Sequence, residues 1–175
     1  RIDPATGKPF KADNPIIAIA ARAPGVNPPA IEAPYVVFRA GYYYLFVSYD
    51  FCCAGAKSTY KVMVGRAKNV QGPYVDFHGR PMTRGGATLV LANHGKWRGP
   101  GHNAVLTTDR RDLLVHHTYD AQHVKAGRIL QIRPLYWPNH AGPRDGWPVV
   151  GRPISEDTTF QATQNGLQAT PKIQD

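Results

Sequence analysis

The sequence is poor in cysteine and has no long hydrophobic run. Its only cysteines, Cys52 and Cys53, are neighbours and cannot link distant parts of the chain, so cysteine content leaves the compartment open. No stretch approaches the roughly 18 apolar residues of a membrane span. The first residues also lack the order of charged, apolar and small residues that marks a signal peptide. We therefore expect no membrane partner.

Acidic residues are also scarce: 12 Asp and Glu stand against 21 Lys and Arg, which gives a net charge of +9. Such an excess can attract nucleic acid, an anionic membrane or an acidic polysaccharide. The basic residues are scattered, however, and no run of five or more would form a nucleic-acid-binding arm. The charge therefore indicates a basic surface, and no nucleic-acid partner is expected.

The composition favours a folded, turn-rich chain. Of the 175 residues, 42% are hydrophobic and only 19% are charged, with 17 Gly and 16 Pro. This combination is untypical of disorder and of helical bundles. It predicts an all-β protein.

Two stretches of the sequence share one pattern of β-branched and aromatic runs separated by Gly/Pro turns. The second run of each stretch closes on Tyr-Asp, at Asp50 and at Asp120. Each stretch predicts a four-stranded meander. The expected strands are 35–39, 42–50, 60–67 and 73–76, then 104–107, 113–120, 128–135 and 147–150.

Consecutive four-stranded meanders are typical of β-propeller blades. A propeller has at least four blades, so two blades predict either more chain upstream or an assembly partner. The alternative is an antiparallel sandwich of about eight strands. The propeller reading divides the chain into the end of a preceding blade with a linker (1–29), two blades (30–98 and 99–151) and a tail or closing segment (152–175).

Candidate site residues gather at one face of the expected blades. Connections into first strands share a face with those between second and third strands, which places Glu32 and His102 at equivalent positions on adjacent blades. Asp50 and Cys52 rim the same mouth. Trp97 precedes the His102 turn and could offer a platform for a sugar ring.

Glu32 lies in an apolar collar of Ile31, Ala33 and Pro34. Partial desolvation by these neighbours would favour the protonated carboxyl that a general acid needs. A solvated loop glutamate is the alternative. His102, in the turn Gly99–Asn103, could hold a metal or a water, or be a hydrogen-bonded structural histidine.

The sequence resembles the endo-arabinanases of glycoside hydrolase family 43 over residues 30–150. The resemblance implies a five-bladed propeller of which this chain supplies the last two to three blades. It also implies a secreted enzyme, extracellular or periplasmic, that hydrolyses α-1,5-linked arabinofuranose in arabinan or pectic side chains with inversion. The matching motifs are Ala30-Ile31-Glu32-Ala33-Pro34-Tyr35, Gly41–Ser48, Phe51-Cys52-Cys53, Ser58-Thr59-Tyr60, Val64-Gly65-Arg66, Gly72–Asp76, Gly99-Pro100-Gly101-His102-Asn103 and Asp145-Gly146-Trp147-Pro148.

By this resemblance Glu32 is the general acid, and His102 holds a central ion, usually calcium, with waters. Asp50, Cys52, Trp97 and Asn103 are expected at the substrate cleft. The family's two catalytic aspartates, which its members carry in earlier blades, have no matching motif here, so the resemblance implies that they lie in an N-terminal half of the propeller. An exo-acting arabinofuranosidase or xylosidase of the same family, and a non-catalytic sugar-binding propeller, are the alternatives.

Overall fold

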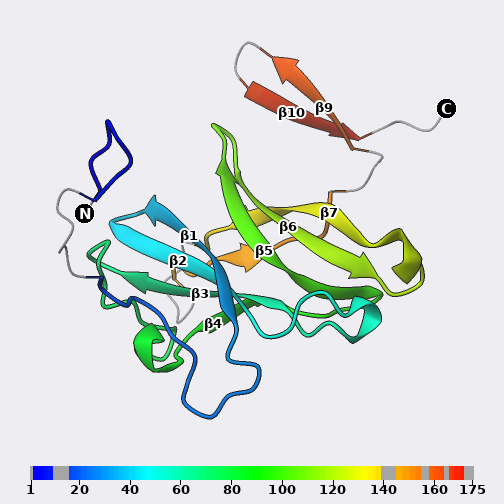
Figure 1. Cartoon of the computed structure of the whole chain (residues 1–175). Helices are drawn as coiled ribbons and strands as arrows, with labels where there is room; N and C mark the ends of the chain where they lie inside the picture. The colour runs from blue at the N-terminus through cyan, green and yellow to red at the C-terminus, as the bar shows by residue number, and fades with distance from the viewer. Residues whose placement is uncertain (1, 10–15, 139–144, 155–157, 164–165, 172–175) are drawn as a thin grey trace.

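The first part of the chain forms a four-stranded antiparallel sheet. The computed structural model describes residues 2–9, 16–138, 145–154, 158–163 and 166–171. Each strand of this sheet pairs with the next along the chain, as in an up-and-down meander (Figure 1). The strands are β1 (Ile31–Arg39), β2 (Tyr42–Tyr49), β3 (Lys61–Ala67) and β4 (Thr88–Leu91).

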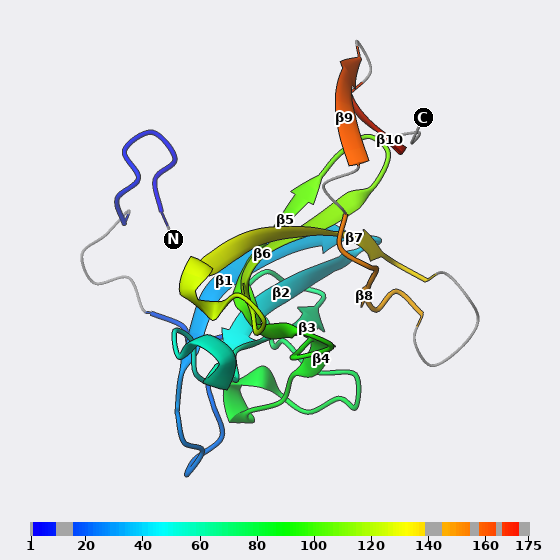
Figure 2. The same ribbon diagram turned by 90° about the vertical axis from the view of Figure 1, so that its right-hand side faces the viewer.

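A second meander repeats the arrangement, and β5 packs across strands of the first sheet. Figure 2 shows that both sheets are strongly curved and lie against each other. The all-β prediction is confirmed, and two neighbouring up-and-down sheets are the arrangement of propeller blades. The strands are β5 (Trp97–Thr107), β6 (Asp112–Asp120), β7 (Arg128–Tyr136) and β8 (Val149–Val150).

The remaining elements are small. Strands β9 (Thr158–Thr163) and β10 (Gly166–Pro171) pair with each other. In the part of the chain that the structure describes, three single-turn 3₁₀ helices occupy connections: η1 (Gly55–Lys57), η2 (Met82–Arg84) and η3 (Val124–Ala126). No helix in the described segments is long and apolar enough to cross a membrane.

The fourth strand of the first sheet lies later than the sequence pattern predicts. We expected it at residues 73–76, but it is β4, and Val75 makes only isolated bridges with Arg66 and Pro81. The Asp76 carboxylate accepts the backbone N–H groups of His78 and Arg80, each at 2.9 Å. These bonds close a turn where the strand would have continued. In the second sheet, the strand expected at 147–150 is present in shorter form as β8.

Strand β2 is buried on both faces, which is why it reads as a continuous apolar run. Tyr44 and Phe46 join a core shared with β5, β6 and β7 of the second sheet. Leu45 and Val47 face the opposite way, into a separate core. The first sheet is therefore a middle layer, covered by the second sheet on one face. The second core contains Leu45, Val47, Tyr49, Ala67, Tyr74 and Met82, with Ile19 and Ala20 packed against it.

His116 makes stability depend on pH. Its side chain is 1% exposed, and burial lowers its pKa from 6.5 to about 4, assisted by the nearby Arg133 cation. The folded state therefore binds this proton less readily than the unfolded state. The contribution of His116 to the free energy of unfolding is fully present above about pH 6.5. About 3 kcal/mol of it is lost as the pH falls towards 4. We expect His116→Leu to flatten the fall in unfolding free energy between pH 7 and pH 4.5, measured by urea denaturation. An equal fall in both proteins would contradict this assignment.

Candidate active site

Glu32 and His102 both lie at β-bulges inside strands. The register of β1 with β2 shifts between Glu32 and Tyr35, and that of β5 with β6 shifts between Gly101 and Ala104. The prediction that both residues precede their strands is therefore wrong, because bulges let the pairing continue through the Gly/Pro-rich segments.

The two residues are also not at equivalent positions. Inside the bulges, Ala33 and His102 share a left-handed backbone, with φ of 48° and 53°. By register and conformation, the counterpart of His102 is therefore Ala33, and the counterpart of Glu32 is Gly101. Bulges redirect side chains and are frequent beside active sites.

The carboxylate of Glu32 is held by a buried phenol. The Oη of Tyr60 donates to Oε2 of Glu32 at 2.7 Å, and Tyr60 is 0% exposed. Burial, followed by the bond to Glu32, raises the pKa of Tyr60 above its usual value, so the phenol remains a donor at neutral pH. Glu32 itself is exposed. The expected apolar collar thus does not bury it within the described chain.

Three rings form a column next to this bond. The ring of Tyr60 stacks on that of His117, with centroids 5.7 Å apart, and His117 stacks on His102 at 6.2 Å. A Cβ on Gly101 would overlap the Tyr60 ring, so only glycine allows the phenol this close to β5. The column joins Tyr60, the residue before β3, to side chains of β6 and β5 in the second sheet.

A buried polar network fixes the two bulges to each other. Ser48 Oγ donates to Asn103 Oδ1 at 2.8 Å and accepts the backbone N–H of His102 at 2.9 Å. The Asn103 Nδ2 donates to the Ala33 carbonyl at 3.3 Å. Asn103 is only 4% exposed, so these bonds position β5 against β1 and β2. Its expected substrate contact stays a prediction.

Cys52 and Cys53 form a disulfide at the edge of the ring column. The Cys52 Sγ lies 3.7 Å from His117 Nε2, and Arg128 Nη1 donates to Cys53 Sγ at 3.3 Å. Burial, and then the positive charge of Arg128, lower the pKa of His117. His117 is therefore neutral at neutral pH. The sequence alone left open whether the two cysteines are joined. The expected position of Cys52 at the substrate cleft stays a prediction.

Asp50 and Trp97 have other contacts. Asp50 accepts ion pairs from Arg22 at 2.5 Å and from Lys61 at 2.6 Å. Trp97 begins β5, with the Lys96 ammonium 4.7 Å from the ring centroid. Their roles in binding substrate stay predictions, since neither joins the network around Glu32 by a described bond.

Sequence reasoning missed Tyr60 and Ser48 as site residues. Tyr60 belongs to the motif Ser58-Thr59-Tyr60, but nothing in one sequence tells that its hydroxyl reaches a carboxylate on another strand. Side chains alternate across a strand, so only one of the neighbours His116 and His117 can face the site. That residue is His117, which joins the ring column, while His116 is buried elsewhere.

A hollow of about 200 Å³ lies beside Glu32, lined mainly by apolar side chains of the second core. No group of three or more His, Cys, Asp or Glu that could hold a metal occurs in the segments the structure describes. The site of this chain therefore consists of one carboxyl group, the phenol bonded to it, two imidazoles and a disulfide.

The chain belongs to the family described as glycosyl hydrolases family 43, which it matches over residues 3–148. It is 38% identical over 148 residues to the extracellular endo-α-(1→5)-L-arabinanase 1 of Bacillus subtilis, covering 85% of this chain and 41% of that protein. It is 42% identical over 120 residues to the extracellular exo-α-(1→5)-L-arabinofuranosidase ArbA of Cellvibrio japonicus, covering 69% of this chain and 33% of that protein.

A solved structure agrees with these similarities. The Cellvibrio cellulosa α-L-arabinanase, complexed with arabinohexaose, superposes with a TM-score of 0.63 at 42% identity, covering 69% of this chain and 36% of that one. The chain thus spans about a third to two fifths of the length of the relatives it matches.

Proposed function

We propose that this chain carries the general acid of an inverting hydrolase that cleaves α-1,5-L-arabinofuranosidic bonds in arabinan. The observation that carries the proposal is the Glu32 carboxyl group, exposed at a bulge and held at one oxygen by the buried Tyr60. Family membership and relatives named for arabinan hydrolysis support the choice of reaction. The complex of a structural neighbour with arabinohexaose supports the substrate.

In this mechanism Glu32 protonates the glycosidic oxygen of the leaving sugar. The bond from Tyr60 fixes the direction of the carboxyl group, while solvent exposure leaves room for substrate. An inverting enzyme also needs a carboxylate base about 6.5–9.5 Å from the acid, with a water between them. We assign that base, and the aspartate that tunes the acid, to further blades of a five-bladed propeller.

The mode of cleavage is tested by the products. Relatives named as endo-acting and as exo-acting are both similar to the chain, so an exo mode is the second candidate. We expect debranched arabinan to yield oligosaccharides early in the reaction, measured by anion-exchange chromatography. Arabinose as the only early product would assign the exo mode. Binding of arabinan without any new reducing ends would instead indicate a non-catalytic sugar-binding propeller.

We assign to His102 the role of a single protein ligand for a calcium ion held otherwise by waters. His102 offers one accessible ligand, since the imidazole is exposed and stands at a bulge, and waters would supply the oxygens that Ca²⁺ prefers. Bound there, the ion would supply positive charge near the acid. The extracellular relatives favour a secreted location.

His102→Ala should remove the bound ion. Calcium content measured by mass spectrometry after gel filtration is expected to fall from about one ion per chain to none. The matched change His78→Ala, of a histidine outside the ring column, should keep the ion. Full calcium content in the His102→Ala protein would contradict the assignment.

A further inference from the structure

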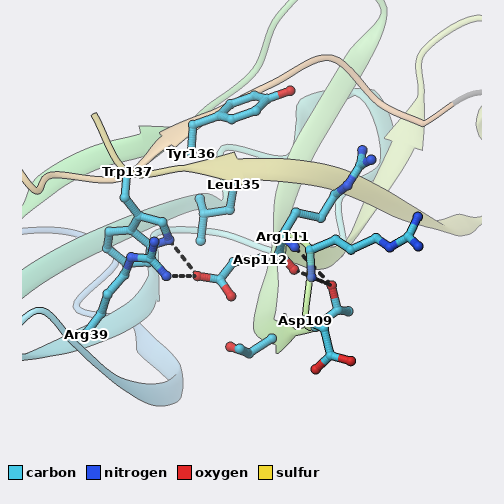
Figure 3. A pocket seen from close by; sticks show the side chains of 10 residues that line it. Arg39, Asp109, Arg111, Asp112, Leu135, Tyr136 and Trp137 are labelled. Atoms are coloured by element: carbon cyan, nitrogen blue, oxygen red, sulfur yellow. Dashed lines mark hydrogen bonds and ion pairs between the residues drawn. The ribbon is translucent and has the colours of Figure 1, made fainter. Parts of the chain in front are cut away.

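A second, larger hollow lies at the opposite end of β1 from Glu32. It measures about 570 Å³ and is formed by Arg39 at the end of β1, the 107–112 turn, and Leu135, Tyr136 and Trp137 (Figure 3). Glu32 and Arg39 are seven positions apart along one strand, which separates their backbones by roughly 20 Å. The hollow is therefore separate from the proposed acid.

The floor of this hollow is a fixed arrangement of charged and aromatic groups. The carboxylate of Asp112, 3% exposed, accepts bonds from Trp137 Nε1 at 2.7 Å and from Arg39 Nη1 at 3.1 Å. The guanidinium carbon of Arg39 also lies 5.3 Å from the Trp137 ring centroid. Figure 3 shows both side chains directed at the Asp112 carboxylate. Asp112 thus orients Arg39 before any ligand binds.

Arg39 retains donors for a ligand. A guanidinium has five N–H groups, and the bond to Asp112 is made by one of its nitrogens. The side chain is 46% exposed, so the rest of the fork can be reached from the hollow. Planar guanidinium groups bind carboxylates through two parallel bonds.

The opposite wall adds positive charge and a flat ring. Thr108 Oγ1 accepts the Arg111 backbone N–H at 3.1 Å and donates to the Arg111 carbonyl at 2.6 Å, which closes the turn that carries Arg110 and Arg111. Tyr136 is 55% exposed and lines the same hollow. An exposed aromatic face beside guanidinium groups suits a sugar ring that bears a carboxylate.

We propose that this hollow binds an acidic polysaccharide, through the uronate carboxylates and the sugar rings next to them. The net charge of +9 would attract such a polymer at longer range. Nucleic acid fits less well, because the basic residues of the sequence are scattered and form no run of five or more that would follow a phosphate backbone. The choice of a sugar polymer, as opposed to another carboxylate, rests on the proposed carbohydrate function.

The test measures binding by the complete protein carrying Glu32→Gln, so that hydrolysis does not contribute. Calorimetry with an oligogalacturonate should show binding, and Arg111→Gln combined with Tyr136→Ala should weaken it at least tenfold. Arg84→Gln removes the same charge from η2 and should change affinity less than twofold. A 20-bp DNA duplex should bind more weakly than the oligogalacturonate.

Three results would overturn the proposal: no binding of oligogalacturonate, equal weakening by Arg84→Gln and by the double variant, or tighter binding of the DNA duplex. Equal weakening would show a general effect of surface charge. Neutral arabinan serves as a separate ligand in the same experiment. If arabinan hydrolysis by the unmodified protein fails while oligogalacturonate still binds here, the proposed reaction is wrong and this second site remains.

Discussion

Replacing Glu32 by Gln is expected to lower kcat on linear arabinan by 10²–10⁴-fold, the usual contribution of a general acid. The amide has nearly the shape of the carboxyl group but cannot give a proton to the leaving oxygen. Its carbonyl can still accept the bond from Tyr60. Substrate affinity and folding should therefore change little. The measurement is the release of reducing ends by the complete protein at saturating substrate.

A matched control separates this effect from loss of charge. Asp145→Asn also converts an exposed carboxylate to an amide, and it leaves in place the Asp145 carbonyl that accepts a bond from Arg66. We expect turnover within twofold of the unmodified protein. A substrate whose leaving group needs no proton, such as a dinitrophenyl arabinofuranoside, should recover most of the rate lost in Glu32→Gln. Normal turnover of arabinan by that variant would contradict the role of Glu32.

Gly101→Ala is expected to lower turnover by about 100-fold, the usual cost of a misplacement of about 1 Å at a reacting group. The added methyl group would overlap the buried ring of Tyr60 and displace the phenol that holds Glu32. Because the core around Tyr60 is closed, the overlap should also lower the free energy of unfolding by about 1–3 kcal/mol. Steady-state kinetics and urea denaturation measure the two effects.

Two further variants distinguish lost geometry from lost stability. Gly79→Ala places a side chain at φ 80° with nothing within 4 Å, so it should cost about 1 kcal/mol of stability and leave turnover unchanged. Tyr60→Phe removes only the hydroxyl and should lower kcat about 10–100-fold, since a bond to a charged group contributes about 1.5–3 kcal/mol. Full activity of Gly101→Ala would show that the position of the phenol does not matter to the reaction.

Local patterns predicted well those features that depend on neighbouring residues. The alternation of His116 and His117 across one strand follows from the two-residue period of a strand and needs no tertiary information. The position of the fourth strand of the first sheet did not follow from the sequence pattern. The side chain of Asp76 competes for the backbone N–H groups of its neighbours and closes a turn. The fourth strand therefore forms later in the chain, as β4.

The sequence by itself determined an all-β chain of two meanders, the family, and the motif that contains Glu32, because strand periods, turn residues and motifs are local properties. Only the tertiary structure decided that bulges bring Glu32 and His102 inside their strands. It also decided that Glu32 lies one residue before the position equivalent to His102. It also decided that Tyr60 holds the carboxyl group, and that Asp112 orients Arg39 at the far end of β1. These contacts join residues distant in the chain, and their geometry depends on register and packing between sheets, which no local pattern records.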